Sequence, residues 1–392
     1  MDLEVYQGIG PFLRRHPVFD RCRHSRLNSI CEHRPDFDPR SGNPSLAGAG
    51  VDLQRCFRSK ASRSLEATAL RTPLIAVVAL SLTTIGAAPT VGADNDPYTG
   101  APGPYAVTYA RNVVLDEPER PEPFVVQVTR PVEVKNSPVI VFSHGFRCEL
   151  AGNDPLVGHW ASHGYTVIQP QHLDAEPNSK IDVYPQHVNW TERRRDMERS
   201  LDLLDQIAAA VPEIAGTLDL SNVIAAGHSY GGLTAQSSGG AKTFSRGEPN
   251  TLVHEPDPRF KAVVAVSPPG RMPGFVDENS AKTISLPMIV TTGTEDFVPP
   301  MMPTWEVHID TYVDAEPGDK YLAVIEGADH RFGGLICGDV GAEPMTEQMA
   351  ILNATTLAFI NSVVQESSQA QAYLDELARA GKTETMFAFE TK

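Results

Sequence analysis

The segment VIAAGHSYGGLTAQ (residues 223–236) contains the pattern that decides the fold. Its apolar start predicts a buried strand, and the residues after Gly231 are of helix-forming type. Between them, Gly227, Ser229 and Gly231 form the pattern G-x-S-x-G. A serine on so tight a strand-to-helix turn needs neighbours without side chains, so that its hydroxyl group projects from the corner. The segment predicts a reactive serine, although this pattern alone also fits a glycine-rich turn with an incidental serine.

Apolar runs alternate with helical patterns on both sides of this segment. A helical pattern covers residues 190–211, with an apolar stripe formed by Met197, Leu201, Leu204 and Ile207 and with charges elsewhere. The strand-like runs cover residues 123–129, 138–143, 165–170, 222–227, 261–267, 286–293 and 321–327. This alternation predicts an α/β fold, with a mostly parallel central sheet and helices on both faces. Catalytic groups are expected just after the carboxyl ends of the strands, where such sheets bind ligands.

The first 93 residues differ from the rest of the chain. Residues 1–70 are rich in arginine, proline and glycine and show no sustained apolar period, so we expect an extension of low order. Residues 71–93 combine a basic flank, a short apolar run and small residues at the exit, which is the pattern of a secretory signal peptide. A buried core helix is the alternative, whereas the run is too short and too interrupted to span a bilayer. We therefore expect a secreted or periplasmic protein.

A signal peptide belongs at the N-terminus, so we expect translation to start internally, near Val51 or Leu65, with residues 1–50 absent from the natural product. After the signal peptide we expect an exposed lead-in over 94–104, which is rich in proline and glycine, and one catalytic domain over 105–392.

Charge and motif content exclude several functions. The formal net charge is −16, which argues against nucleic-acid binding, because phosphates need lysine and arginine side chains to neutralise them. The catalytic domain has no Cys/His cluster with zinc spacing and no phosphate-binding glycine loop. We expect no metal, no organic cofactor and no stable membrane span.

A reactive serine needs a base that is itself oriented by a carboxylate. In hydrolases of this sheet type the chain order is serine, acid, histidine. Asp296 follows the run 286–293 and His330 follows the run 321–327, so both come after strands in that order. Glu295 is the rival for the acid. We interpret the other histidines of the expected catalytic domain as turn-shaping neighbours (His144 and His228) or as structural or exposed residues (His159, His163, His172, His187, His254 and His308).

Acyl transfer also needs donors that face the developing oxyanion. The segment VIVFSHGFRCE (residues 139–149) ends a strand and turns at His144 and Gly145, which places the backbone N–H of Phe146 as one candidate donor. The N–H of Tyr230, directly after the serine, is the other. Phe146 and Tyr230, together with Phe332 and Trp160, are candidates for an apolar acyl cleft, with core packing as the alternative. The aperiodic stretch 170–190 is expected to border the site.

These motifs together resemble the α/β-hydrolase superfamily over most of residues 105–365. The closest similarity is to predicted dienelactone hydrolases and to bacterial relatives of platelet-activating-factor acetylhydrolase, and more distantly to cutinases and polyester-degrading hydrolases. The resemblance implies a serine hydrolase that cleaves carboxylic esters through an acyl-enzyme, with Ser229, Asp296 and His330 as its triad. True dienelactone hydrolases use a cysteine nucleophile, so Ser229 favours ester hydrolysis. The alternatives are a polymeric ester substrate and a non-catalytic binding protein of the same fold.

Two of the five cysteines, Cys148 and Cys337, lie in the catalytic domain, each in a loop on the catalytic side of the sheet. In an exported protein a disulfide between them is expected, with two free thiols as the alternative.

Overall fold

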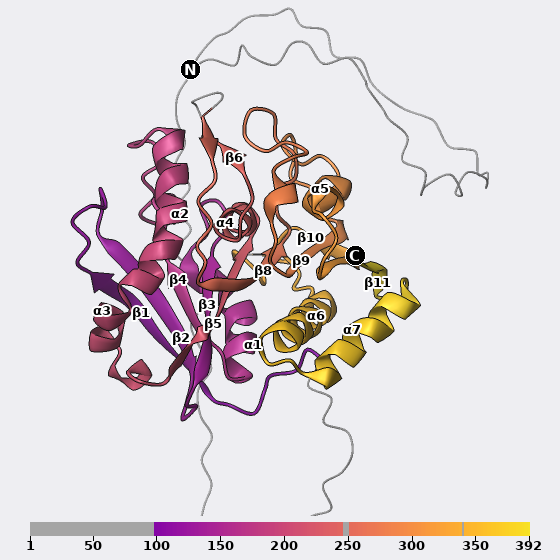
Figure 1. The fold of residues 1–392 in the computed structure, drawn as a ribbon, viewed down its shortest axis with the longest axis horizontal. Helices are drawn as coiled ribbons and strands as arrows, with labels where there is room; N and C mark the ends of the chain where they lie inside the picture. Colours follow the sequence, from indigo (N-terminus) through magenta and orange to yellow (C-terminus); the bar gives the residue numbers. More distant parts are fainter. Residues whose placement is uncertain (1–97, 246–250, 339–340) are drawn as a thin grey trace, which may run out of the picture. The chain divides into compact units, whose positions relative to one another are not determined.

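The computed structural model describes residues 98–245, 251–338 and 341–392, all within one compact unit, Gly86–Lys392 (Figure 1). The expected N-terminal extension, the signal-peptide segment and the first residues of the lead-in lie outside the described residues. No helix of the described residues combines the length and hydropathy that crossing a membrane requires.

The centre of this unit is a nine-stranded sheet with the order β1-β2-β4-β3-β5-β8-β9-β10-β11. The six strands from β4 to β10 in this order pair in parallel, whereas β1, β2 and β11 are antiparallel additions at the two edges. The strands are β1 (Val107–Leu115), β2 (Phe124–Pro131), β3 (Ser137–Ser143), β4 (Thr166–Pro170), β5 (Leu218–His228), β8 (Phe260–Val266), β9 (Met288–Glu295), β10 (Lys320–Asp329) and β11 (Met386–Thr391). A separate small pair consists of β6 (Thr243–Phe244) and β7 (Leu252–Val253).

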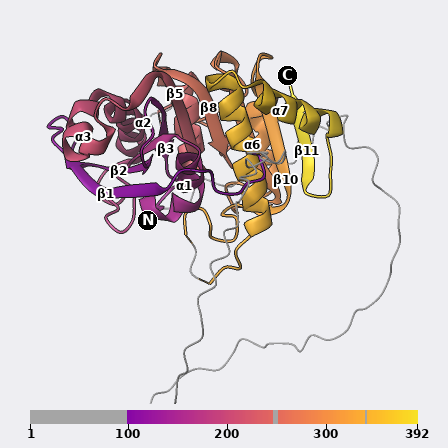
Figure 2. The same cartoon turned by 90° about the horizontal axis from the view of Figure 1, so that it is seen from below.

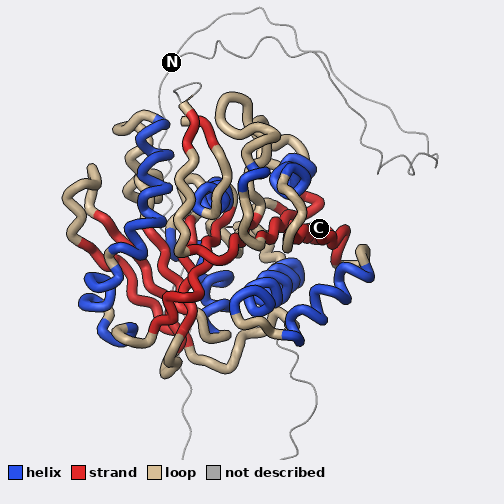
Figure 3. Tube along the Cα trace, in the orientation of Figure 1, coloured by secondary structure: helices blue, strands red, loops and turns tan. Residues whose placement is uncertain are grey.

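Helices cover the sheet, as Figure 3 shows with helices in blue and strands in red. They are α1 (Asp154–Ser162), α2 (Gln186–Asp202), α3 (Leu204–Ala210), α4 (Tyr230–Ser238), α5 (Asp310–Asp314), α6 (Thr346–Val364) and α7 (Ser368–Ala380). Four short 3-10 turns complete the elements: η1 (Leu150–Asn153), η2 (Pro212–Ile214), η3 (Ala281–Thr283) and η4 (Trp305–Ile309). The architecture confirms the predicted α/β fold.

The alternation of side chains along the strands gives the sheet two buried faces. In β3, Ile140 and Phe142 pack into one hydrophobic cluster with α1, α6 and α7, while Val139 and Val141 pack into a second cluster with α2, α3 and α5. Figure 2 shows α6 and α7 together beside β10 and β11, away from α2 and α3. Burial on both faces explains why the central strands read as continuous apolar runs in the sequence.

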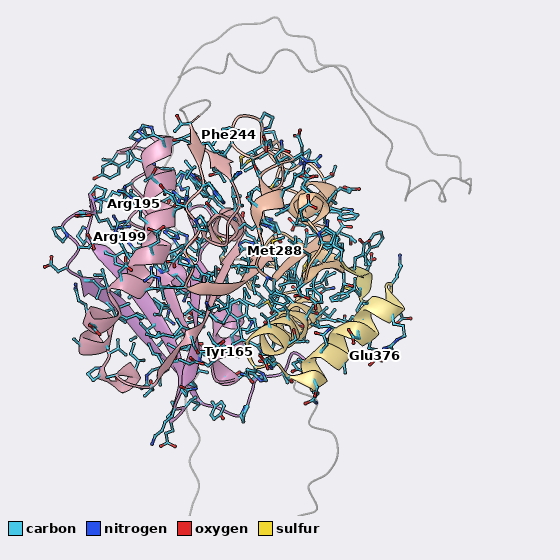
Figure 4. The ribbon with its side chains drawn as sticks, in the orientation of Figure 1. Tyr165, Arg195, Arg199, Phe244, Met288 and Glu376 are labelled. Carbon is cyan, nitrogen blue, oxygen red and sulfur yellow. A yellow bond between two sulfur atoms is a disulfide. The ribbon has the colours of Figure 1, made fainter. Side chains whose placement is uncertain are left out.

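All seven predicted strands are present, but the edge strands β1 and β11 were not predicted. The helical pattern over 190–211 forms two helices, α2 and α3, with the break at Leu203. Burial of α2 extends beyond its apolar stripe, because its buried charged residues include Glu192, Arg193, Arg194, Asp196 and Arg199. Of the two arginines labelled in Figure 4, Arg199 is buried and Arg195 is exposed.

Candidate active site

Ser229 lies on the turn between β5 and α4. Its backbone φ is +55°, a left-handed conformation that is costly for a residue with a side chain. The Ser229 N–H donates to the Val266 carbonyl at the end of β8, which holds the strained turn against the sheet (2.8 Å). Strain that the surrounding structure maintains in this way is typical of functional sites.

The two glycines of the motif are required by close backbone packing. A Cβ atom on Gly227 would overlap the carbonyl of Gly231, and one on Gly231 would overlap the carbonyl of Ser143 at the end of β3. The serine turn and the end of β3 therefore touch through bare backbone. This contact is the physical reason for glycine on both sides of Ser229.

The structure brings Ser229, His330 and Asp296 together from the carboxyl ends of β5, β10 and β9. Ser229 Oγ lies 2.9 Å from His330 Nε2, and His330 Nδ1 lies 2.7 Å from Asp296 Oδ1. With Nδ1–H donating to the carboxylate, Nε2 has a lone pair that accepts the serine proton. This is the geometry of a serine nucleophile, its base and the acid that orients the base.

Asp296 is completely buried, and its second oxygen, Oδ2, accepts a hydrogen bond from Thr292 (2.8 Å). Burial alone would raise the pKa of Asp296, but the contacts from His308 and His330 hold it well below its usual value. The carboxylate is therefore ionised. Its rival Glu295 is exposed, and the neighbouring Asp329 accepts the backbone N–H groups of Arg331 and Gly333.

The turn after β3 lies directly against Ser229. A Cβ atom added to Gly145 would lie 3.5 Å from the Cβ atom of Ser229, so the backbone of this turn approaches the nucleophile closely. The side chain of Phe146 is half exposed, and its ring meets that of Tyr230 edge to face, with 6.3 Å between centroids. The two candidate donor residues are thus in contact with each other, and each lies beside a backbone segment that contains or approaches Ser229.

Arg193, on α2, holds this turn in place through hydrogen bonds. Its buried guanidinium donates to the carbonyls of His144 (2.9 Å) and Gly145 (3.2 Å) and lies over the Tyr230 ring at 4.6 Å. Because those carbonyls are bonded to Arg193, the turn is fixed in one orientation relative to Ser229. Sequence reasoning missed this role, since a run of three arginines in a helix usually indicates a solvated face.

Asp174 in turn holds Arg193 and the turn after β3. It forms two 2.9 Å hydrogen bonds with Arg193 and accepts the backbone N–H of Arg147. Burial raises the pKa of Asp174, but the charge of Arg193 outweighs this effect and lowers the pKa to about 2.

The depressed pKa of Asp174 predicts a pH-dependent stability. Its folded-state pKa is about 2, against about 3.9 in an unfolded chain. The carboxylate therefore stabilises the folded state above about pH 4, and this contribution is lost as pH falls from about 4 to about 2. Chemical unfolding across this range should show a steeper loss of stability in the wild type than in Asp174→Asn. Asp205→Asn, which removes an exposed carboxylate of α3, is the matched control and should keep the wild-type slope.

A cleft of about 420 Å³ opens on Ser229. Its wall contains both apolar and polar residues. The apolar ones are Phe146, Ile181, Tyr230, Pro269, Met272, Met301 and Met302, and the polar ones are Asp174, Asp182, Gln186, Asn189 and Ser229. The stretch 170–190 borders the site, as predicted. Phe146 and Tyr230 line the cleft, but Phe332 and Trp160 do not: both are fully buried in the core cluster with α1 and α6.

Asp296, His308 and His330 are the group of described residues whose donor atoms could hold a metal ion, since those atoms lie within 4.8 Å of one another. However, Asp296 Oδ1 lies only 2.7 Å from His330 Nδ1. Two ligands of a tetrahedral zinc ion, each about 2.0–2.1 Å from the metal, would be about 3.3 Å apart. The spacing is that of a hydrogen bond, and the same atoms are already used in the Ser229 arrangement.

A disulfide joins Cys148 to Cys337, with 5.0 Å between their Cα atoms. Cys148 lies two residues after Phe146, and Cys337 lies seven residues after His330. The bond therefore ties the turn beside Ser229 to the loop that carries His330.

One further residue at the site was not predicted. His308, interpreted from the sequence as structural or exposed, lies against Asp296 with 3.0 Å between Nε2 and Oδ1. It comes from η4, a short 3-10 turn without a sequence motif, and nothing in the residue pattern distinguishes it from the other histidines.

Comparison with known proteins gives a family match. A model of the Chlorophyllase family, which is of α/β-hydrolase type, matches residues 101–294. The matched span includes Ser229 and the turn after β3 but ends before Asp296 and His330. No curated protein matches the sequence.

Proposed function

We propose that this protein of α/β-hydrolase fold is an exported serine esterase that cleaves carboxylic esters through an acyl-enzyme. The observation that carries the proposal is the row of contacts from Ser229 Oγ to His330 Nε2 (2.9 Å) and from His330 Nδ1 to Asp296 Oδ1 (2.7 Å), beside a cleft that Ser229 lines. The family match to an ester-hydrolase type supports the same reaction class.

The proposed reaction has two halves. Ser229 Oγ attacks the ester carbonyl carbon while His330 Nε2 takes the hydroxyl proton, and the backbone N–H groups of Phe146 and Tyr230 stabilise the oxyanion. The C–O bond then breaks, and His330 gives its proton to the departing alcohol. In the second half, water attacks the acyl carbon while His330 takes a proton from it. The bond from the acyl carbon to Ser229 Oγ then breaks, and His330 returns the proton to Ser229, which releases the acid.

Export is part of the proposal. It is supported by the signal-peptide pattern over 71–93 and by the Cys148–Cys337 disulfide, because such bonds persist mainly in oxidising compartments. The arrangement of Ser229, His330 and Asp296 favours carboxylic esters as substrates. The resemblance to esterases related to platelet-activating-factor acetylhydrolase favours small ones.

The second candidate is a polymeric ester, of the kind cleaved by cutinase-like enzymes. The observation that favours it is the apolar rim of the cleft: the lining residues Phe146 and Met301 are 49% and 57% exposed. Phe297, next to Asp296, is 46% exposed. Exposed apolar side chains around a site are typical of contact with an extended apolar surface.

The test compares purified protein on soluble p-nitrophenyl esters of graded acyl length and on an insoluble polyester film. For the first candidate we expect efficient hydrolysis of the soluble esters, with an optimum at a chain length that fits the cleft, and little release of soluble product from film. Preferential release of product from film would favour the second candidate. No hydrolysis of either, with protein correctly folded by circular dichroism, would overturn the proposal.

A further inference from the structure

His308 occupies a buried position behind the acid of the site. It is in η4, and its side chain is completely inaccessible to solvent. Its ring lies 5.5 Å from the His330 ring, between centroids, and both imidazoles approach the same oxygen of Asp296. Asp296 Oδ1 is therefore flanked by two ring nitrogens, at 2.7 Å from His330 and 3.0 Å from His308.

Both nitrogens of the His308 ring face oxygen atoms that can only accept hydrogen bonds. Nδ1 lies 2.8 Å from the Pro268 carbonyl, and Nε2 lies 3.0 Å from Asp296 Oδ1. The second contact is at ion-pair distance but is not aligned as a hydrogen bond. This ring orientation nevertheless places a nitrogen, and not a ring carbon, against each of the two oxygens.

Neither neutral tautomer fits these contacts. A proton on Nδ1 alone would satisfy Pro268 but would place the Nε2 lone pair against the negative carboxylate oxygen. A proton on Nε2 alone would place the Nδ1 lone pair against the Pro268 carbonyl. Protonation of both nitrogens removes both repulsions, since the imidazolium has a donor on each side.

We propose that His308 is a positioning residue that, as an imidazolium protonated on both nitrogens, holds Asp296 in the orientation in which it accepts from His330. The catalytic consequence rests on the proposed esterase function, whereas the charged state of His308 does not. Thr292 fixes Oδ2 and the two imidazoles fix Oδ1, so the carboxylate has no freedom to rotate.

The groups that face His308 agree with this charge. Asp296 approaches from the end of β9, His330 from the end of β10, and the carbonyls of Ser267 and Pro268 from the end of β8. Burial lowers the pKa of His308, but Asp296 and the two carbonyls outweigh this effect and raise it above the usual value. On the segment of His308 itself, Glu306 is exposed, and Asp310 accepts the backbone N–H of Arg271.

The charged state is tested on the resting wild-type protein by nitrogen-15 NMR with labelled histidine, at about pH 7.5, one unit above the ordinary histidine pKa of about 6.5. We expect two protonated nitrogens in His308. The internal references are His159, His172 and His228, because burial lowers their pKa values to about 3, about 4 and about 3, so each is neutral. Signals that show one proton on His308, assigned by their loss in His308→Gln, would overturn the proposal.

The positioning role is tested by kinetics of His308→Gln. Glutamine carries no charge and cannot face both Pro268 and Asp296 with an N–H group, so Asp296 gains freedom. A misplacement of about 1 Å can cost about 100-fold in rate, and we expect kcat to fall about 10- to 100-fold with KM changed less than about threefold. The matched control is His159→Gln, which replaces a buried histidine of α1 and should leave kcat within about twofold of the wild type.

An unchanged kcat in His308→Gln would overturn the positioning role. Failure of the esterase proposal is distinguishable: the wild type would then neither hydrolyse esters nor react with a fluorophosphonate, while the NMR measurement would still report the protonation of His308. If His308→Gln does not fold, the NMR result on the wild type, with signals assigned by elimination against His159→Gln and the other single variants, decides the charged state.

Discussion

Ser229→Ala is expected to lower kcat for p-nitrophenyl butyrate by about 10⁶-fold, the scale of loss seen when the nucleophile of a serine hydrolase is removed. Alanine has no oxygen to attack the carbonyl, so only the oxyanion donors and the cleft remain. The fold should be unaffected, because the Ser229 hydroxyl contacts His330, and removing this contact leaves no buried charge unpaired.

The control for this variant is Ser221→Ala, since Ser221 is exposed and its hydroxyl bonds only to Asp219 among the described residues. Thermal unfolding should give similar Tm values for both variants and the wild type. Retention of more than about 1% of wild-type kcat in Ser229→Ala would contradict the assignment, since an essential nucleophile costs far more than two decades.

Asp296→Asn is expected to lower kcat by about 10⁴-fold, as loss of the orienting carboxylate does in related triads. The amide can turn its NH₂ group toward His330 Nδ1, which then accepts and leaves the proton on Nε2. In that tautomer Nε2 cannot take the Ser229 proton. KM should change little, because Asp296 is buried and does not line the cleft.

Glu295→Gln is the matched control, because Glu295 is the adjacent carboxylate and is exposed. We expect its kcat to stay within about twofold of the wild type. The reverse ranking, with Glu295→Gln inactive and Asp296→Asn active, would move the acid to Glu295 and contradict the proposed geometry.

The residues predicted from the sequence are those that follow strands. Ser229, Asp296 and His330 each come directly after an apolar run, and in a parallel sheet the carboxyl ends of the strands share one edge. Sequence order and turn composition were therefore enough to predict that these three distant residues lie close together. The glycines beside Ser229 were predicted because a tight turn needs neighbours without side chains, and the structure adds that Cβ atoms there would overlap backbone carbonyls.

The residues missed by sequence reasoning act through tertiary contacts. Arg193 lies in a charged helix, and only the docking of α2 against the turn after β3 buries its guanidinium. His308 comes from a 3-10 turn twelve residues after Asp296, with no periodic pattern to indicate which way its ring faces. Trp160 and Phe332 were left between the cleft and the core, because an aromatic residue has the same sequence signal in both places; the structure places both in the core.

The edge strands show a related limit. β1 and β11 pair antiparallel at the edges of the sheet, and β1 is exposed along much of its length. Without burial on both faces, such strands lack the continuous apolar run that identified the central ones.

The most direct test of the account is to react the wild-type protein with a fluorophosphonate probe and map the adduct by peptide mass spectrometry. We predict one adduct per chain on Ser229, with hydrolytic activity lost in proportion to labelling and with much slower labelling of Asp296→Asn. An adduct on another residue, or full ester hydrolysis by protein that the probe does not modify, would contradict the account.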